Sequence, residues 1–528
     1  MPDFLSFINE ILWGSVMIYL LLGAGIWFSW QTRGIQFRYV RKFGRSLKKS
    51  LHPQPGGLTS FQALCTSLAA RVGSGNLAGV TLAIAAGGPG AVFWMWVSAL
   101  LGMASSFAEC SLAQLYKERD SRGQFRGGPA WYMARGLGMR WMGVLFSILL
   151  LLAYGFIFNT VQANSVAHAL RYAFDLPAAV SGGVLAVVVL LAILRGLRGV
   201  ARLMQWIVPF MALLWIATSL LIGLWHITAL PTIFATIFRC AFGWQEAAAG
   251  AVGYTISQAL TSGFQRGMFS NEAGMGSSPN AAAAAASWPP HPAAQGIVQM
   301  IGVFIDTIVI CTASAIIVML APRPDNEYTL NGIQDLRHAM SVLVGGWGAG
   351  FIALIVLLFA FSSIVANYVY AENNLVFLRL DKPRYIWGLR ILTVLMVLLG
   401  TMVSLPVVWQ SADIIMALMA MTNLTAILLL SPTVRIIASD YLRQRRLGIQ
   451  PTFDATRYPD IDQQLAPGAW NEFTTATAAR CSATAYFFAE MLSRALNVPV
   501  GVIDSSWGGS RIECWTPRAA LETYPDID

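Results

Sequence analysis

The stretch from Arg71 to Gly102 constrains the fold more than any other part of the sequence. It reads RVGSGNLAGVTLAIAAGGPGAVFWMWVSALLG, which is apolar enough to lie in a bilayer but is interrupted by glycine and by the polar Ser74 and Asn76. Lipid cannot satisfy the backbone groups of an interrupted helix, so such a break must line a cavity or bind something. Broken helices of this kind mark the substrate and ion sites of secondary transporters. This stretch therefore favours a transporter.

Long apolar runs recur along nearly the whole chain. Of the 528 residues 56% are apolar and 12% are charged, and the mean hydropathy of +0.59 lies outside the range of ordinary soluble domains. Since a helix of about 20 apolar residues spans the hydrocarbon core, we predict an all-α polytopic membrane protein with eleven transmembrane helices. The predicted runs are 11–31, 58–85, 90–115, 141–165, 177–195, 205–227, 246–268, 294–320, 343–371, 387–406 and 410–432.

The net charge of +9 reflects basic residues that follow the membrane topology, and these residues do not form a patch for binding nucleic acid. Basic residues gather in alternate loops, at 33–49, 117–140, 195–202, 379–384 and 435–446. Lys and Arg near helix ends remain on the cytoplasmic side. Eleven spans then place the N-terminus outside and the C-terminus inside. The first run follows Asp3 and Glu10, so no cleavable signal peptide is predicted. The six cysteines form no CxxC pair, and no metal cofactor is expected from them.

Four blocks of sequence carry a family resemblance. They are GGPGAVFWMWVSALLG at 87–102, FNTVQAN at 158–164, RGMFSNEAGMGSSPNAAAAA at 266–285 and FIDTIVICTA at 304–313. In this order they resemble the alanine/glycine:cation symporter (sodium:alanine symporter) family over about residues 10–470. The resemblance implies a leucine-transporter-type fold, with two inverted repeats of five helices preceded by one extra helix. It also implies uptake of a small neutral amino acid, alanine or glycine, coupled to sodium or in some members to protons.

The resemblance also implies a division of the chain and a location. Residues 1–50 would hold the extra helix and a basic cytoplasmic loop, 51–227 the first repeat, 228–446 the second repeat, and 447–470 a cytoplasmic tail. Such a symporter works by alternating access in the cytoplasmic (inner) membrane of a bacterium. Its partners would be the amino acid, sodium and the lipid bilayer.

Two helix breaks are expected to form the substrate site, because the first and sixth core helices of this fold unwind near the bilayer midplane. The first is Gly73, Ser74, Gly75 and Asn76, where glycine permits close approach and freed amides can hold a carboxylate. The second is predicted at Thr261, Ser262 and Gly263, whose carbonyls would face the substrate ammonium. The alternative is that these small residues only allow close helix packing.

A sodium site is expected, by analogy with the fold, between the first and eighth core helices. The carbonyls of Ala69 and Val72 and the hydroxyls of Ser362 and Ser363 would supply oxygen ligands. The alternative is that the two serines bond back to the preceding helical turn.

Polar side chains inside apolar runs are further candidates, because polar groups in the membrane are costly. Gln162 is predicted to contact the substrate, or else to join neighbouring helices, and Asn159 is expected to face the bundle interior. Asp306 would either help to hold the coupling cation or pair with a polar neighbour such as Arg71. Glu109 is assigned no role, since it lies near a cytoplasmic helix end where it could reach water.

The identity of the amino acid stays open because of one substitution. Asn367 stands where many alanine or glycine transporters of the family carry tryptophan. Loss of that ring would widen or polarise the pocket. Glutamine or another polar amino acid is therefore an alternative substrate, with Asn367 as a further binding residue.

The end of the chain has a different character. The segment at 481–515 resembles a piece of a sialate O-acetylesterase, an SGNH-type hydrolase, but the block carrying that family's nucleophilic serine is absent. We predict a helix at 483–497 and a strand at 499–505, a small α/β fragment within 471–528 that is not functional. So short a piece lacks the area for a firm core. A membrane-tethered esterase is accordingly the less favoured function.

Overall fold

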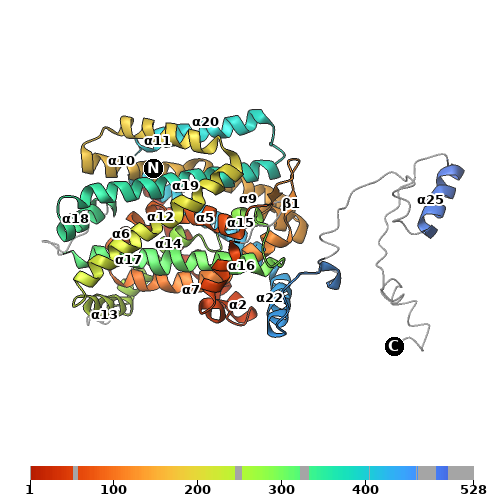
Figure 1. Cartoon of the computed structure of the whole chain (residues 1–528), viewed down its shortest axis with the longest axis horizontal. Coiled ribbons are helices and arrows are strands. Elements are labelled where there is room, and N and C mark those ends of the chain that lie inside the picture. The colour runs from red at the N-terminus through yellow and green to blue at the C-terminus, as the bar shows by residue number, and fades with distance from the viewer. Residues whose placement is uncertain are drawn as a thin grey trace. The chain divides into compact units, whose positions relative to one another are not determined.

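The computed structural model describes residues 2–51, 57–243, 252–321, 332–403, 405–458, 461 and 483–496. The chain divides into two compact units, residues 1–465 and 466–528. The described part of the first unit is helical apart from one two-stranded hairpin and an isolated bridge between Leu58 and Ala285 (Figure 1). In the second unit the described element is helix α25, Ala483–Leu496, which confirms the predicted helix there. The predicted strand at 499–505 lies outside the described residues.

The helices of the first half are bounded as follows. They are α1 Pro2–Ile11, η1 Leu12–Met17, α2 Ile18–Gln31, α3 Ile35–Val40, α4 Phe43–Ser50, α5 Ser60–Arg71, η2 Ser74–Asn76, α6 Ala78–Gly87, α7 Gly90–Leu115, α8 Pro129–Trp131, η3 Tyr132–Gly136, α9 Arg140–Leu152, η4 Ala153–Ile157, α10 Phe158–Phe174, α11 Ala178–Ile193 and α12 Gly196–Trp225. The hairpin joins β1 (Glu118–Arg119) and β2 (Phe125–Arg126) in antiparallel register, with Glu118 opposite Arg126.

The second half follows with a similar series. Its helices are α13 Leu230–Ala241, α14 Val252–Asn271, α15 Ser278–Ala283, α16 Pro292–Val303, η5 Phe304–Cys311, α17 Thr312–Leu320, α18 Gly332–Val344, α19 Gly348–Phe377, α20 Pro383–Gly400, α21 Leu405–Leu429, α22 Ser431–Arg446 and η6 Ala455–Arg457.

Eight helical stretches of the described residues are long and apolar enough to cross a membrane. They are Phe4–Gln31, Gly90–Leu115, Arg140–Phe174, Gly196–Trp225, Pro292–Leu320, Gly348–Phe377, Pro383–Gly400 and Val407–Leu429. Each coincides with one of the eleven predicted runs. The other three runs fall on helices that are interrupted (α5 and α6), short (α11) or more polar (α14).

Helix α5 lies in the middle of the bundle. It contacts α12, α15, α16 and α19. Figure 1 shows α10, α11, α19 and α20 grouped on one side of α5, and α7, α14, α16 and α17 on the other. The outer helices expose large apolar side chains such as Leu213 on α12 and Leu191 on α11, as expected of surfaces that face lipid. The helix interrupted near Gly73 is thus enclosed by the bundle.

Candidate functional site

The first predicted break is present where the sequence placed it. Helix α5 ends at Arg71, a single 3-10 turn covers Ser74–Asn76, and α6 begins at Ala78. The side chain of Asn76 holds the break, since its Oδ1 accepts a hydrogen bond from the Gly73 amide at 3.2 Å. The break is fully buried, so its backbone groups are directed at protein atoms and not at lipid.

Gln162 of α10 lies against this break, a position that fits both of its predicted roles, the substrate contact and the link between neighbouring helices. Its Oε1 accepts a hydrogen bond from the Ser74 amide at 2.9 Å. A Cβ atom added to Gly73 would lie 2.7 Å from Gln162 Nε2 and 2.6 Å from Ser363 Oγ, so only glycine fits there. The Ser74 hydroxyl is buried and has no hydrogen-bond partner among the described residues. Hydrogen-bonding capacity is therefore left at this point of the bundle.

Asp306 is joined to the same break from the opposite side. It lies in the π-helical turn η5 and is completely buried. Its Oδ1 accepts from Asn76 Nδ2 at 2.6 Å, and its Oδ2 accepts from the hydroxyls of Ser270 (2.5 Å) and Thr307 (2.8 Å). A carboxylate with three short donors is electrostatically stabilised and can also offer oxygen to a cation.

Asp306 does pair with polar neighbours, which was the second of its two predicted roles, but Arg71, the example named for that role, is not one of the donors. The Arg71 guanidinium is buried and donates to Ser278 Oγ at 2.5 and 2.8 Å and to the Gln299 carbonyl at 3.1 Å. Arg71 therefore fastens α5 to α15 and α16. The polar neighbours of Asp306 are Asn76, Ser270 and Thr307.

The two serines proposed for sodium differ in what they contact. Ser363 Oγ donates to the Ala69 carbonyl at 2.8 Å, so two of the oxygens predicted as sodium ligands, one from α19 and one from α5, are in contact. Ser362 Oγ instead lies 2.9 Å from the Phe359 carbonyl and 3.5 Å from Met211 Sδ, on α12. Both serines also bond back to Phe359, which was the alternative interpretation. Of the pair, Ser363 is the one placed beside the break.

The second break is not at Thr261, Ser262 and Gly263, and that prediction is wrong. Helix α14 continues through these residues to Asn271. A Cβ on Gly263 would lie 2.5 Å from the Ala91 carbonyl oxygen of α7, so this glycine permits close helix packing. Ser262 also lies at a close helix contact, because a Cβ added to Gly87 of α6 would lie 2.8 Å from the Ser262 Cβ. The packing alternative is therefore correct for this segment.

The second interruption lies between α14 and α15, at residues 272–277. Glu272, Gly274 and Gly276 there have φ values of 53°, 82° and 85°, a left-handed conformation that ends a helix. The sequence signal that could have located it is the alternation of glycines in GMG at 274–276, two residues after Glu272.

Glu109 holds this second interruption, a role that the sequence did not indicate. Its carboxylate accepts from the amides of Gly274 (3.3 Å) and Gly276 (3.2 Å) and from Asn423 Nδ2 (2.8 Å). The side chain is 0% exposed, so the expectation that it reaches water is wrong. Position along a helix indicates depth, but it does not reveal which loop meets the side chain.

Asn367 lies on α19 and faces α10. Its Nδ2 donates to Asn159 Oδ1 at 3.0 Å, while Asn159 Nδ2 donates to the Tyr154 carbonyl at 2.8 Å. The expectation that Asn159 faces the bundle interior is thus confirmed. Asn367 Oδ1 is buried and has no partner among the described residues. This position offers a polar acceptor.

An aromatic layer covers Gly75. A Cβ on Gly75 would lie 2.6 Å from the ring of Phe269, whose centroid is 4.8 Å from Trp409 and 5.6 Å from Phe158. The Arg266 guanidinium lies 4.9 Å from the Trp409 ring and forms a 2.8 Å ion pair with Asp413. One side of the break is therefore covered by these aromatic rings and by the Arg266–Asp413 ion pair.

A family model for the sodium:alanine symporter family matches residues 1–455. This chain belongs to that family. The symporter is 71% identical over 472 residues to the uncharacterized transporter YaaJ of Escherichia coli, with 89% of this chain and 99% of YaaJ covered. It is 43% identical to the probable sodium/glutamine symporter GlnT of Bacillus subtilis (86% and 92% covered). It is 38% identical to the sodium/alanine symporter AgcS of Methanococcus maripaludis (82% and 96% covered).

The fold of the symporter is also similar to that of a solved membrane transporter. The Eremococcus coleocola manganese transporter superposes with a TM-score of 0.51 at 14% identity, covering 79% of this chain and 88% of that one. These matches confirm the predicted polytopic symporter and identify the chain as a transporter and not an enzyme. None of them supports the esterase-like interpretation of residues 471–528.

Proposed function

We propose that this symporter imports a small neutral amino acid together with sodium by alternating access. The observation that carries the proposal is the meeting of Gly73–Ser74, Gln162 and Ser363 at one buried break. A glycine at the centre lets the backbone approach a ligand as small as alanine. Buried polar groups fix the ligand's orientation, and the surrounding helices exclude water.

The substrate carboxylate would bind at Gly73, Ser74, Gly75 and Asn76. The Ser74 amide is a donor there, as is the Ser74 hydroxyl, which has no partner among the described residues, and the nearby Gln162 side chain can reorient to make room. Phe269 would limit the length of the substrate side chain, because its ring already touches Gly75. Alanine or glycine fits such a space best.

Glutamine is the alternative substrate. Asn367 presents a buried amide oxygen, without a partner in the part of the chain that the structure describes, that could accept a hydrogen bond from a side-chain amide. The relative GlnT carries a name that refers to sodium and glutamine. Asn367 would then select for the polar side chain, as a hydrogen bond that a site requires discriminates strongly between substrates.

Sodium would bind between α5 and α19. Ser363 Oγ and the Ala69 carbonyl are already in contact, and the Val72 carbonyl is assigned to the same site. On binding, the Ser363 hydroxyl would turn its hydrogen away and offer its oxygen to the ion. Asp306, two hydrogen bonds away from Gly73 through Asn76, is proposed as a second cation or proton position.

The proposed topology has eleven spans. The eight long apolar helices are joined by α11 and by the two interrupted pairs, α5 with α6 and α14 with α15. Helices α1 and α2 would be the extra span, and one interrupted pair then begins each five-helix repeat, in 51–227 and 228–446. The basic loops keep the C-terminus inside and the N-terminus outside the inner membrane.

Proteoliposomes test this function. An inward sodium gradient should drive accumulation of labelled alanine above equilibrium, and an equal potassium gradient should not. Unlabelled glycine and glutamine as competitors identify the preferred substrate, and a proton gradient alone tests proton coupling. The variant Asn367→Trp should weaken competition by glutamine more than competition by glycine. Absence of accumulation of any neutral amino acid under both ion gradients would refute the proposal.

A further inference from the structure

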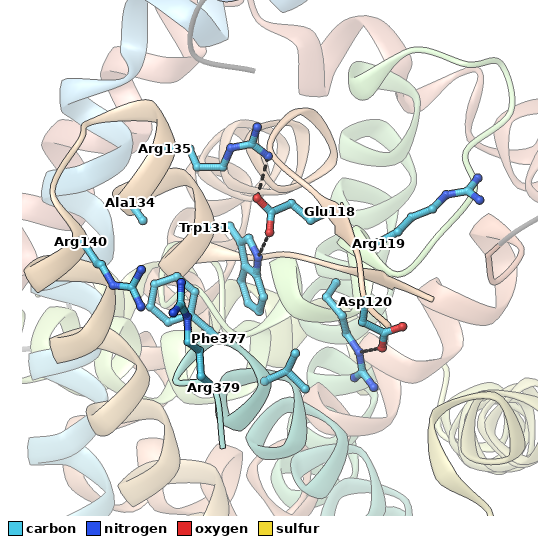
Figure 2. Close-up of a pocket in the computed structure, with 11 residues that line it drawn as sticks. Glu118, Arg119, Asp120, Trp131, Ala134, Arg135, Arg140, Phe377 and Arg379 are labelled. Atoms are coloured by element: carbon cyan, nitrogen blue, oxygen red, sulfur yellow. Dashed lines mark hydrogen bonds and ion pairs between the residues drawn. The ribbon is translucent and has the colours of Figure 1, made fainter. Parts of the chain in front are cut away.

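A cavity of about 300 Å³ opens beside the β1–β2 hairpin, far along α19 from Ser363. Figure 2 shows its walls, which come from the hairpin, from α8 and η3, from the start of α9 and from the end of α19. Five arginines and two carboxylates line it, so the lining carries a net charge of +3. Nothing in the proposed transport reaction uses this cavity.

The two carboxylates are already neutralised. Glu118 pairs with Arg135 at 2.9 Å and accepts from Trp131 Nε1 at 3.3 Å. Asp120 pairs with Arg126 at 3.0 Å. Of the remaining arginines, Arg119 lies 4.9 Å from the Phe125 ring.

Among the described residues, Arg140 and Arg379 are left without a counter-charge. Neither guanidinium has a hydrogen bond or ion pair within the described part of the chain. Figure 2 shows the two side chains on the same side of Trp131, next to Phe377. Two neighbouring cations without an acid are an arrangement that an anion would stabilise.

The backbone at Arg379 adds a second, independent observation. Arg379 has a φ of +61°, two residues beyond the end of α19, where glycine is the usual residue. An arginine in the left-handed region costs conformational energy. Its presence there directs the guanidinium into the cavity and is consistent with a binding role.

An apolar stripe begins directly beside Arg140. Trp141, Leu145, Ile148 and Leu152 are 66%, 42%, 48% and 42% exposed. Their spacing of four, three and four residues places them on one face of α9. A tryptophan next to an arginine at a helix start is typical of the membrane–water interface. The stripe therefore continues from the cationic cavity into the hydrocarbon region.

We propose that this cavity binds the phosphate headgroup of an anionic phospholipid, with an acyl chain along the α9 stripe. Arg140 and Arg379 would both contact the phosphate, and Trp141 would lie at headgroup depth. Basic pockets on the cytoplasmic side of membrane proteins bind such headgroups, and the loops that form this one are among the basic, inward-facing loops. A soluble phosphate would use the arginines but not the stripe.

Bound lipid would connect α9 to the end of α19. Helix α19 also carries Ser363 and Asn367, and its end is held to the hairpin by the 3.2 Å pair of Glu372 with Arg126. The lipid would therefore hold one end of the helix whose middle meets the proposed sodium site. The lipid site itself does not depend on which amino acid or ion is carried.

Native mass spectrometry of the purified protein with phosphatidylglycerol or phosphatidylcholine tests the proposal. Wild type should retain phosphatidylglycerol preferentially, and Arg140→Gln/Arg379→Gln should reduce that retention by about tenfold or more, as loss of two charged contacts implies. The matched control is Arg195→Gln/Arg198→Gln, two exposed arginines at the start of α12. It should retain lipid like wild type.

Two further measurements separate the sources of the anion. Ile148→Gln leaves both arginines in place and should weaken phosphatidylglycerol retention, because the acyl chain loses apolar contact. Millimolar inorganic phosphate should not displace the lipid. The proposal would be overturned if both double variants lost phosphatidylglycerol equally, or if Arg140→Gln/Arg379→Gln retained it with an unchanged melting temperature. Full displacement of the lipid by phosphate would also overturn it.

Discussion

Replacing the two adjacent serines of α19 one at a time separates a sodium ligand from a structural hydroxyl. Ser363 Oγ lies 2.8 Å from the Ala69 carbonyl, whereas Ser362 Oγ lies toward Met211. Both are fully buried and both bond to Phe359, so the alanine variants lose the same atom in similar surroundings. Ser362→Ala is therefore a matched control for Ser363→Ala.

The expected size of the effect follows from the contact that is lost. One oxygen ligand of a cation is comparable to a hydrogen bond to a charged group, about 1.5–3 kcal/mol. Since about 1.4 kcal/mol corresponds to a factor of ten, Ser363→Ala should raise the sodium concentration for half-maximal uptake by roughly 10- to 100-fold. Ser362→Ala should leave that concentration within about twofold, because it removes no contact with α5.

The assay is initial alanine uptake into proteoliposomes as a function of external sodium, with the amount of inserted protein measured for each variant. The maximal rate at saturating sodium should change little in Ser363→Ala, since substrate contacts remain. An unchanged sodium dependence in Ser363→Ala, or an equal shift in both variants, would refute the assignment of Ser363 to the ion.

Four other changes have defined outcomes. Gly75→Val should abolish amino-acid binding in calorimetry, because even a Cβ would lie 2.6 Å from Phe269. The control Gly79→Ala, where the nearest atom is 3.8 Å from the added Cβ, should bind the amino acid normally. Normal affinity in Gly75→Val would exclude this break as the substrate site. Glu109→Leu leaves three buried donors unpaired, which costs about 1–3 kcal/mol of stability for each donor. This variant should therefore lower the melting temperature far more than Glu109→Gln, which keeps one acceptor. Equal melting temperatures of the two variants would contradict this. Burial lowers the pKa of His291 to about 4, against the opposing effect of Asp440. In the unfolded chain this histidine has a pKa of about 6.5, so between about pH 4 and 6.5 the unfolded chain binds more protons than the folded one. The free energy of unfolding should therefore fall as the pH drops through that window, by up to about 1.4 kcal/mol per pH unit. The melting temperature of His291→Asn, which keeps an acceptor for the Ala293 amide, should vary less with pH, and parallel curves would count against the argument. Deleting residues 471–528 should leave sodium-driven uptake unchanged; loss of transport with normal membrane insertion would reveal a role for that segment.

The first break could be predicted from sequence because its signal is local. Glycine and polar residues inside an apolar run are incompatible with lipid whatever their neighbours are. The second break was misplaced by about three helical turns, since Thr261–Gly263 looks like a break but packs against α7. Small residues occur both at helix breaks and at close helix contacts, and only the packing of the neighbouring helix distinguishes the two.

The choice between Ser362 and Ser363 shows the same limit. Adjacent helical residues point about 100° apart, so both cannot face α5. Composition does not reveal which one does. Likewise, Glu109 could be placed near a helix end from sequence, but its contacts with Gly274 and Gly276 join segments more than 160 residues apart. Such contacts follow from tertiary packing alone.

Gln162 has a consequence for how tightly the symporter can hold its cargo. Its side-chain oxygen accepts the hydrogen bond of the Ser74 amide. An incoming carboxylate would therefore exchange one acceptor for another, and would gain only the difference between a charged and a neutral hydrogen bond. At the proposed site, the Gln162 side chain would thus compete with the substrate carboxylate for this donor. A carrier with such a competitor would bind its substrate with moderate affinity and release it readily, and the Ser74 amide would regain an acceptor when the substrate leaves.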